Sequence, residues 1–258
     1  MTEHVLIEKS KGVLTLTLNR PDKKNALSNE MYGALGDAID NAPDDPEVRC
    51  ILIQANGDMF TAGNDLSSFA AVNSGEAPSG DRRGGSALIM ALARAKTPVV
   101  AAVNGRAVGV GTTMLLHCDL VFLAEDALLT TPFVNLALVP EAASSIQLPD
   151  RIGHARAFSM FVLGEAVDAK KAEAWGIANA VVPLDQLRAR ARAAAEAVAA
   201  KPPSAVAITK ALMREPERLL ARIAEEGAHF GTQLKTAEAK EAFAAFREKR
   251  APDFSKVS

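Results

Sequence analysis

Residues 98–124 read PVVAAVNGRAVGVGTTMLLHCDLVFLA, and this stretch decides the fold. Its first apolar run, residues 98–103, has the length and composition of a buried strand, and residues 119–124 repeat the pattern. Between them, residues 110–117 suit a helix that feeds the second strand. Strands that alternate with helices in this way are the signature of an α/β core.

The same alternation continues on the N-terminal side of this unit. Residues 5–18 alternate between apolar and polar side chains with a break at Lys11-Gly12, which predicts an antiparallel hairpin with Leu14, Leu16 and Leu18 on one face. Residues 73–85 are rich in Gly, Ser and Ala without a hydrophobic period, which predicts a mobile segment. The other predicted elements are a helix over 29–41 capped by Ser28, a strand over 48–53 and a helix over 86–95.

The composition changes to helix formers after Pro140, which predicts an all-helical last third. We divide the chain into a core, residues 1–200, and a helical C-terminal region, residues 201–258. An apolar stripe in the last part of the chain is expected either to cover the ligand site or to contact another subunit. Its members are Ile223, Phe230, Leu234, Phe243 and Phe246. The predicted helices are 156–163, 168–175, 184–200, 204–214 and 217–235.

Charge and length exclude several classes of protein. The 258 residues carry 29 Lys and Arg against 31 Asp and Glu, and a net charge of -2 without a basic block argues against a nucleic-acid partner. No apolar run approaches the ~20 residues that span a bilayer, so a membrane partner is not expected. Cys50 and Cys118 each lie in an apolar stretch, as buried thiols do in a reducing compartment. We therefore expect a cytoplasmic protein.

A single carboxylate, Glu141, stands in the apolar and small-residue run 131–145. Burial disfavours the charged form of a carboxyl group, so its pKa should rise toward the range in which it can move protons near neutrality. This makes Glu141 the first candidate for chemistry. Taken alone, Val-Pro-Glu-Ala also suits a turn whose Glu points into water.

Two loops contain the small residues that allow a backbone to approach a ligand closely. One covers residues 60–66, and the other, residues 102–113, opens a helix whose positive dipole end favours developing negative charge. Together they can form an oxyanion hole, although each alone is also an ordinary turn composition. Gly105, Gly109 and Gly111 do not have the spacing of a dinucleotide-binding fingerprint, so no nicotinamide or flavin is expected.

The order and spacing of these segments resemble the crotonase family, also called the enoyl-CoA hydratase/isomerase superfamily, over nearly the whole chain. The resemblance rests on residues 19–27, 60–66, 102–111, 118–119, 131–145 and 164–182. It implies an α/β core, a spiral of ββα repeats, with a helical C-terminal region for trimerisation, and homotrimers or hexamers. It also implies a coenzyme A thioester as substrate, with no other cofactor and no metal.

The resemblance also implies a set of site residues. The backbone N–H groups of Asn64 and Val110 would hold the thioester oxygen. Asp65 is expected to cap the turn or helix that follows it rather than to react. The nucleotide end of the substrate would lie along Lys24, Asn25, Ala26 and Leu27 and beside Ala62. The remaining predicted substrate-binding residues are Gly63, Asp65, Leu66, Gly109, Phe133, Leu136 and Leu138.

The positions that match the two glutamates of the family's hydratases are Thr113 and Phe133, and neither side chain can transfer a proton at neutral pH. Glu141 instead matches the single acid of the Δ3,Δ2-enoyl-CoA isomerases, although Ala142 stands where that branch more often has glycine. A shift of a double bond needs one base that removes the α-proton and returns it at C4. Phe133, Leu136 and Leu138 would help to exclude water.

Other interpretations stay open at this stage. A hydratase of fatty-acid β-oxidation could use another carboxylate, and the family's fold also hosts hydrolases, dehalogenases and decarboxylases. A non-catalytic acyl-CoA-binding protein would keep the two loops yet tolerate the loss of Glu141. His117 and His154 are expected to be core or surface residues rather than catalysts.

Overall fold

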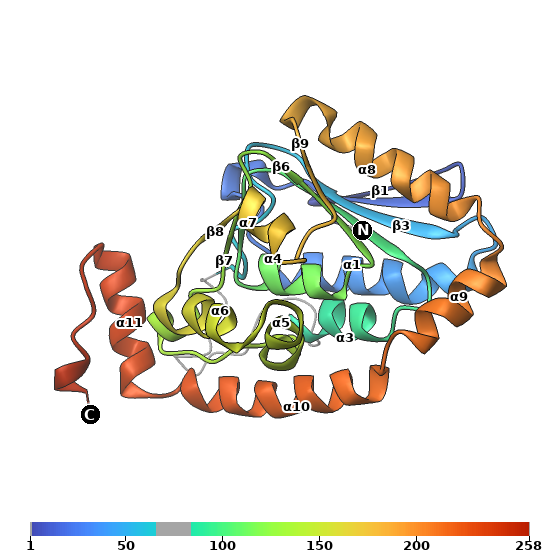
Figure 1. Ribbon diagram of the computed structural model, residues 1–258. Coiled ribbons are helices and arrows are strands. Elements are labelled where there is room, and N and C mark those ends of the chain that lie inside the picture. The colour runs from blue at the N-terminus through green and yellow to red at the C-terminus, as the bar shows by residue number, and fades with distance from the viewer. Residues whose placement is uncertain (1, 66–83, 258) are drawn as a thin grey trace.

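A computed structural model describes residues 2–65 and 84–257 and confirms the predicted α/β architecture (Figure 1). Leu66 and all but the last two residues of the stretch 73–85 lie outside the described part. The main sheet has six strands, in which only the first pair is antiparallel. In spatial order its strands are β1 (Val5–Ser10), β2 (Val13–Leu18), β3 (Cys50–Ala55), β4 (Val99–Val103), β6 (Leu120–Ala124) and β9 (Ala180–Val182).

Helices cover both faces of this sheet (Figure 1). On one face lies α8 (Leu184–Ala199), whose alanines pack against side chains of β2, β3, β4 and β6. On the other lie α1 (Asn29–Asn41) and α3 (Ser86–Arg94), which contact each other. The predicted caps and bounds of α1 are confirmed, because the Ser28 side chain accepts a hydrogen bond from Met31 N–H.

The predicted N-terminal hairpin is confirmed, and its second strand, β2, is buried on both faces. Leu14, Leu16 and Leu18 do share a buried face, but Thr15 and Thr17 on the opposite face are 5% exposed as well. An alternation of apolar and polar residues is typical of a strand with one face in solvent, which β2 is not. The covering helix, α8, is more than 160 residues away in the sequence, so the local pattern of β2 does not reveal it.

A second, smaller sheet gives the core its repeated ββα turns. It contains β5 (Arg106–Val108), β7 (Leu128–Thr130) and β8 (Val167–Asp168). The chain runs from β4 through β5 into the short helix α4 (Val110–Thr113), and from β6 through β7 into the 3-10 turn η4 (Val134–Leu136). β4 and β6 of the large sheet are thus each followed by a short strand of the small sheet and then by a helical turn.

The last third is not all-helical, because β8 and β9 complete the two sheets after Pro140. Two predicted helices are also interrupted. Residues 110–117 divide into α4 and the 3-10 helix η3 (Met114–His117), and 156–163 into α6 (His154–Phe158) and the π-helical turn η5 (Ser159–Leu163). The remaining helices are α5 (Ser144–Ile152), α7 (Ala169–Ala174), α9 (Pro203–Leu212), α10 (Pro216–Gln233) and α11 (Ala237–Glu248).

The C-terminal apolar stripe folds back mostly onto its own chain. α10 runs beside α3, and α11 extends past η4 (Figure 1). Leu234 is buried, while Ile223, Phe230 and Phe243 are partly buried against the core. Phe246 is the exception, with 58% of its surface exposed. The division of the chain at residue 200 stays a prediction.

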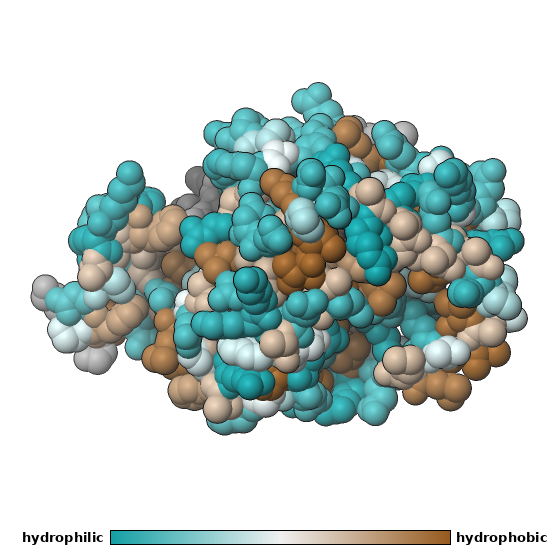
Figure 2. Space-filling view, turned by 45° about the horizontal axis from the view of Figure 1, so that its top comes forward, coloured by the Kyte–Doolittle hydropathy of each residue, from teal (hydrophilic) through white to brown (hydrophobic). Residues whose placement is uncertain are grey.

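Exposed apolar side chains gather on α9. Ile208, Leu212 and the following Met213 are 61%, 83% and 80% exposed. Figure 2 shows brown side chains at the end of the molecule where Figure 1 places this helix. Among the described residues no helix is both long enough and apolar enough to cross a membrane.

Candidate active site

Glu141 lies in a tight turn between η4 and the start of α5. The two residues after it, Ala142 and Ala143, have positive φ angles of 63° and 56°, which is uncommon for residues that carry a Cβ. The Thr113 hydroxyl donates a hydrogen bond to Glu141 Oε1 over 2.6 Å. Glu141 is therefore not a solvent-facing turn residue, because the end of α4 holds its carboxylate.

The surroundings of Glu141 shift its proton affinity. Burial raises the pKa of Glu141 from 4.5 to about 7, the hydrogen bond from Thr113 opposes this rise, and the negative charge of Glu226 adds to it. A carboxyl group with a pKa near 7 can both accept and return a proton at neutral pH. This is the property that the sequence predicted for this residue.

The two glycine-containing loops are held side by side. A parallel bridge pairs Thr61 with Ala107, and Val108 N–H donates to Thr61 O over 3.1 Å. Asn64 and Val110 each follow the bridge by three residues, so the pairing brings them to corresponding positions. The approach is close enough to require glycine, since a Cβ on Gly63 would lie 2.7 Å from Val108 O and one on Gly111 2.4 Å from Thr61 Cγ2.

The N–H groups of Asn64 and Val110 are not used by the pairing of the loops. Leu27 forms a bridge with Asn64, but the donors in it are the N–H groups of Leu27 and Asp65. Val110 begins α4, directly after Gly109 with φ 56° and ψ −118°, and the first N–H groups of a helix have no partner within it. That these two amides hold the oxygen of a thioester stays a prediction.

A small cavity of about 60 Å³ lies between these loops. Its wall includes the predicted residues Phe133, Leu136 and Leu138, and it also includes Phe230 from α10. Glu141 lies beside the cavity rather than in its wall, three residues beyond Leu138 in the chain. The other lining residues are Ala62, Gly63, Asn64, Val108, Gly109, Val110 and Pro132.

The segment predicted to lie along the nucleotide end of the substrate runs beside the first loop. Ala62 N–H donates to Lys24 O, and Leu27 N–H donates to Gly63 O. Lys24 is exposed and forms an ion pair with Asp58. The structure therefore brings Lys24, Asn25, Ala26 and Leu27 next to Ala62, and their contact with a substrate stays a prediction.

Asn25 has a structural role that the sequence did not indicate. Its side chain accepts from Arg20 N–H and donates to Asn56 O and Met59 O, each over 2.8 Å. The residue is 1% exposed and has a φ of 51°. Because both polar atoms of its side chain are used, any contact of Asn25 with a ligand must come from its backbone.

Asp65 forms an ion pair with Arg20, whose Nη1 lies 2.8 Å from Asp65 Oδ2. This bond ties the end of the first loop to the N-terminal segment. The turn or helix that Asp65 was expected to cap lies outside the described residues, as does the predicted binding residue Leu66. Both of these predictions therefore remain predictions.

Two residues near the site were missed from the sequence. Tyr32 on α1 is buried and donates a hydrogen bond to the Asn64 side-chain oxygen. Burial, and then the charge of Glu141, raise the pKa of Tyr32 well above 10. Glu226 on α10 accepts hydrogen bonds from Ala143 N–H (2.6 Å) and Ser145 N–H (3.0 Å). Its place on the apolar face of α10, between Ile223 and Phe230, was the available signal.

The histidines and cysteines do not take part in this site. Burial lowers the pKa of His117 to about 4, and its Nε2 lies 2.7 Å from Ala142 O, so it supports the turn as a neutral ring. Burial raises the pKa of both Cys50 and Cys118 to about 12, as expected for unreactive core thiols. Among the described residues no group of three or more His, Cys, Asp or Glu side chains could hold a metal ion.

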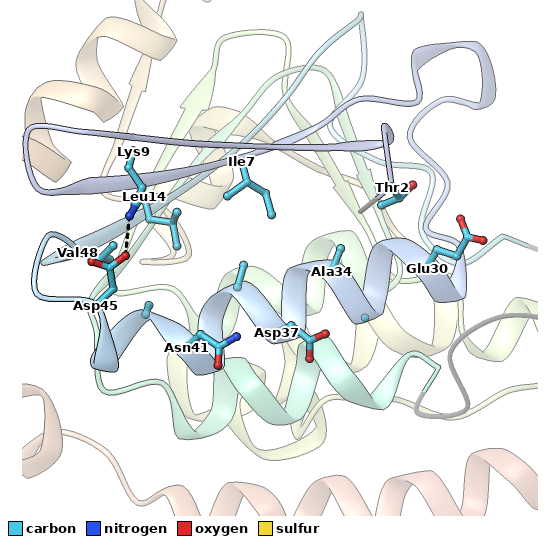
Figure 3. Close-up of a pocket in the computed structure, with 13 residues that line it drawn as sticks. Thr2, Ile7, Lys9, Leu14, Glu30, Ala34, Asp37, Asn41, Asp45 and Val48 are labelled. Atoms are coloured by element: carbon cyan, nitrogen blue, oxygen red, sulfur yellow. Dashed lines mark hydrogen bonds and ion pairs between the residues drawn. The ribbon is translucent and has the colours of Figure 1, made fainter.

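A larger cavity lies elsewhere, between the β1–β2 hairpin and α1 (Figure 3). Its volume is about 840 Å³. Ile7 and Leu14 enter it from the strands, and Asp37 and Asn41 line it from α1. Lys9, the only cation among the described residues of its wall, donates a hydrogen bond to Asp45. None of the residues predicted for the chemistry lines this groove, so its size does not make it the active site.

Comparisons with known proteins agree with this geometry. A family model described as enoyl-CoA hydratase/isomerase matches residues 8–257. The 1,2-epoxyphenylacetyl-CoA isomerase of Escherichia coli K12 is 32% identical over 99% of both chains, and the carnitinyl-CoA dehydratase of Salmonella typhi is 34% identical over 98% of both. The crystal structure of an enoyl-CoA hydratase/isomerase from Pseudoalteromonas atlantica T6c is 42% identical, with a TM-score of 0.92 over 98% of this chain and 100% of that one.

Proposed function

Because the chain belongs to the enoyl-CoA hydratase/isomerase family, we propose that it is a Δ3,Δ2-enoyl-CoA isomerase in which Glu141 alone moves the proton. The observation that carries this proposal is one carboxylate with a pKa of about 7 beside two unpaired N–H groups. The comparisons include relatives named for isomerisation, hydration and dehydration, so the choice among these reactions rests on the site itself.

In the proposed reaction, the Glu141 carboxylate removes a proton from C2 of a 3-enoyl thioester. The electrons of the broken C–H bond form a dienolate whose charge lies largely on the thioester oxygen. The protonated Glu141 then returns the same proton at C4, which leaves the double bond between C2 and C3. A single carboxyl group suffices because the reaction neither consumes nor releases a proton, and no cofactor besides the coenzyme A of the substrate is needed.

The N–H groups of Asn64 and Val110 would stabilise the oxygen of the dienolate. Loss of one such donor typically costs roughly 3 kcal/mol in the barrier. Phe133, Leu136 and Leu138, with Phe230 from α10, would keep water from the intermediate, because they form an apolar wall around the cavity. The Thr113 hydroxyl positions the base and does not exchange protons itself.

A hydratase is disfavoured by the two positions at which that reaction would need acids. Thr113 donates its hydrogen bond to Glu141, and Phe133 lies in the cavity wall with its ring 6.1 Å from that of Phe161. Neither side chain can deprotonate water. Glu226, the other carboxyl group close to Glu141, is engaged by two backbone N–H groups.

The test is turnover of 3-hexenoyl-CoA to 2-hexenoyl-CoA, identified by mass and chromatography. Glu141→Gln removes the base with little change in shape and should lower kcat by at least about a hundredfold. Glu125→Gln, at an exposed position, is the matched control and should retain full activity. Activity of Glu141→Gln within about tenfold of wild type would rule out its role, and water uptake by 2-hexenoyl-CoA would favour the hydratase.

A second candidate reaction is the isomerisation of a thioester that carries an oxygen on its acyl group. The Tyr32–Asn64 hydrogen bond places polar side chains beside an otherwise apolar cavity, and a relative 32% identical is named 1,2-epoxyphenylacetyl-CoA isomerase. Tyr32→Phe would weaken turnover of an oxygen-bearing acyl group selectively if this reaction is the principal one. Equal effects on 3-hexenoyl-CoA would favour the Δ3,Δ2 isomerase.

A further inference from the structure

A second cavity, of about 680 Å³, lies at the opposite edge of the main sheet from the oxyanion loops. Its floor includes Pro98 and Asp119, which precede β4 and β6, whereas the oxyanion loops follow the carboxyl ends of β3 and β4. Its walls come from η3, α5, the end of α8, α9 and the start of α10. A ligand in this cavity therefore cannot be part of the catalytic site.

Positive charge exceeds negative charge among the residues that line this second cavity. Five cations, Arg151, Lys201, Lys210, Arg214 and Arg218, face three acids, Asp119, Asp150 and Glu215. The deepest cation, Lys210, is only 7% exposed and pairs with Asp119 over 2.7 Å. A second acid of the wall, Asp150, pairs with Arg218 over 3.7 Å, so two of the three acids already have a cation as partner.

In the described part of the chain, the hydrogen bonds of Arg151 and Arg214 go to backbone carbonyls only. Arg151 Nη2 donates to Leu116 O, and Arg214 donates to Leu92 O and His117 O. Lys, Arg and His side chains often donate to the last carbonyls of a helix, which explains these contacts. Within the described residues, Arg151, which is exposed, and Arg214, which is partly buried, have no carboxylate as a hydrogen-bond partner. Burial lowers the pKa of Lys210 and of Arg151, and the charge of Arg214 lowers both further.

Apolar side chains make up much of the rest of the wall. Val198, Val206, Met213 and Leu219 surround the cations, and Ile146 faces them from α5. We propose that this cavity binds an amphipathic anion, a carboxylate at the end of an alkyl chain, with the carboxylate against Arg151 and Arg214. Guanidinium groups match carboxylates in shape as well as charge, and the apolar wall would cover the chain.

The groove between the hairpin and α1 provides an internal comparison (Figure 3). It is of similar size, but its wall contains Glu30, Asp37 and Asp45 with Lys9 as the only cation. Size alone would make both cavities equal as sites for a carboxylate. The excess of positive charge in the cavity beneath α9 favours binding of an anion there, and the excess of negative charge in the groove at α1 disfavours it.

The experiment measures binding of octanoate, octan-1-ol and octylammonium to the full chain by titration calorimetry. Octanoate should bind one per chain, and saturation with hexanoyl-CoA should not displace it. Arg151→Met should weaken octanoate binding at least about tenfold, since it removes one charge-assisted bond. Lys9→Met, in the groove at α1, is the matched control and should leave the affinity unchanged.

A second variant, which keeps every cation of the cavity, tests whether octanoate binding is lost for a reason other than a structural effect of replacing Arg151. Ala205, exposed on α9 in the cavity wall, would fill the space when changed to tryptophan, and Ala205→Trp should abolish octanoate binding with an unchanged Tm. No octanoate binding at about 1 mM, equal binding of octan-1-ol, or displacement by hexanoyl-CoA would overturn the proposal. None of these outcomes bears on the isomerase activity, which is measured separately.

Discussion

Glu141 owes its properties to two opposing effects on one carboxyl group. Burial and the charge of Glu226 raise its pKa, while the hydrogen bond from Thr113 lowers it, and the balance lies at about 7. In the proposed reaction, Thr113, which matches a hydratase glutamate in position, would be a positioning residue for the single acid. The chemistry of Thr113 lies in holding the carboxylate rather than in exchanging protons with a substrate.

Thr113→Val should move the pH profile of the reaction to higher pH. The change removes the hydroxyl that stabilises the charged form of Glu141, so the pKa of Glu141 rises above about 7 and less base is ionised at neutrality. The rising limb of kcat/KM against pH should shift by roughly one unit. Thr113→Ser keeps the hydroxyl and should keep the wild-type profile; an unshifted limb in the valine variant would contradict the assigned role.

The raised pKa of Glu141 should make the folded protein less stable at high pH than at low pH. Its pKa is raised in the folded state, so its contribution is complete below the ordinary value of 4.5 and is lost as pH rises through about 7. Glu141→Gln does not titrate. Between pH 4.5 and about pH 7, the free energy of unfolding of Glu141→Gln should therefore increase relative to that of wild type, by roughly 3 kcal/mol at most. Denaturant titrations measure this difference. A constant difference would show that Glu141 is not buried as described.

At the scale of elements, the turn between β1 and β2 places a lysine in a left-handed backbone conformation that lysine seldom adopts. Lys11 and Gly12 both have positive φ, 50° and 77°, as the two central residues of a hairpin turn of this length often do. Glycine adopts this conformation freely, whereas lysine does so at a cost. The Lys11–Glu196 ion pair, at 3.7 Å, compensates little at the surface.

Lys11→Asn should stabilise the protein by about 0.5 to 1 kcal/mol, because asparagine adopts the left-handed conformation more readily in such turns. The rise in Tm on thermal unfolding measures this gain. Lys9→Asn, at the neighbouring paired position, should not raise Tm, since it breaks the bonds to Asp45 and Glu47.

The elements themselves could largely be predicted from the sequence, because caps and hydrophobic periods are local. The capping residue Ser28 and the helical spacing of apolar residues in 29–41 predicted α1 with its bounds. The alternation of apolar and polar residues in 5–18 predicted the hairpin. What failed depended on distant contacts. The strands β8 and β9 have two and three residues, and only pairing with β7 and β6 makes them strands. Tyr32 and Glu226 were missed because their partners at the site are distant in the sequence: Asn64 lies 32 residues from Tyr32, and Ala143 lies 83 residues from Glu226.

At the scale of the whole molecule, the outer face of α9 is left uncovered by the chain itself. Ile208, Leu212 and Met213 are more than half exposed on this helix and the residue after it. The homotrimer or hexamer that the family resemblance implies would bury such a face. The contact of this surface with another copy remains a prediction.

Leu212→Glu should lower the mass of the assembly, because a charge in an apolar interface is costly to bury. Sedimentation of wild type should give a multiple of 27.2 kDa, and the variant should shift toward the single chain. Arg190→Glu, on α8, changes charge without touching this face and should sediment as wild type does. A single-chain mass for wild type at high concentration would contradict the prediction.

Phe230 closes the catalytic cavity from α10, while the rest of its wall comes from residues 62–138. A ribosome therefore releases the oxyanion loops and Glu141 long before the side chain that seals them. Until α10 emerges and docks, the carboxyl group has neither Glu226 beside it nor a wall against water, so its pKa stays closer to that of a free glutamate. If the chain has the proposed isomerase activity, we expect that activity to begin only when α10 has been synthesised and Phe230 and Glu226 are in place.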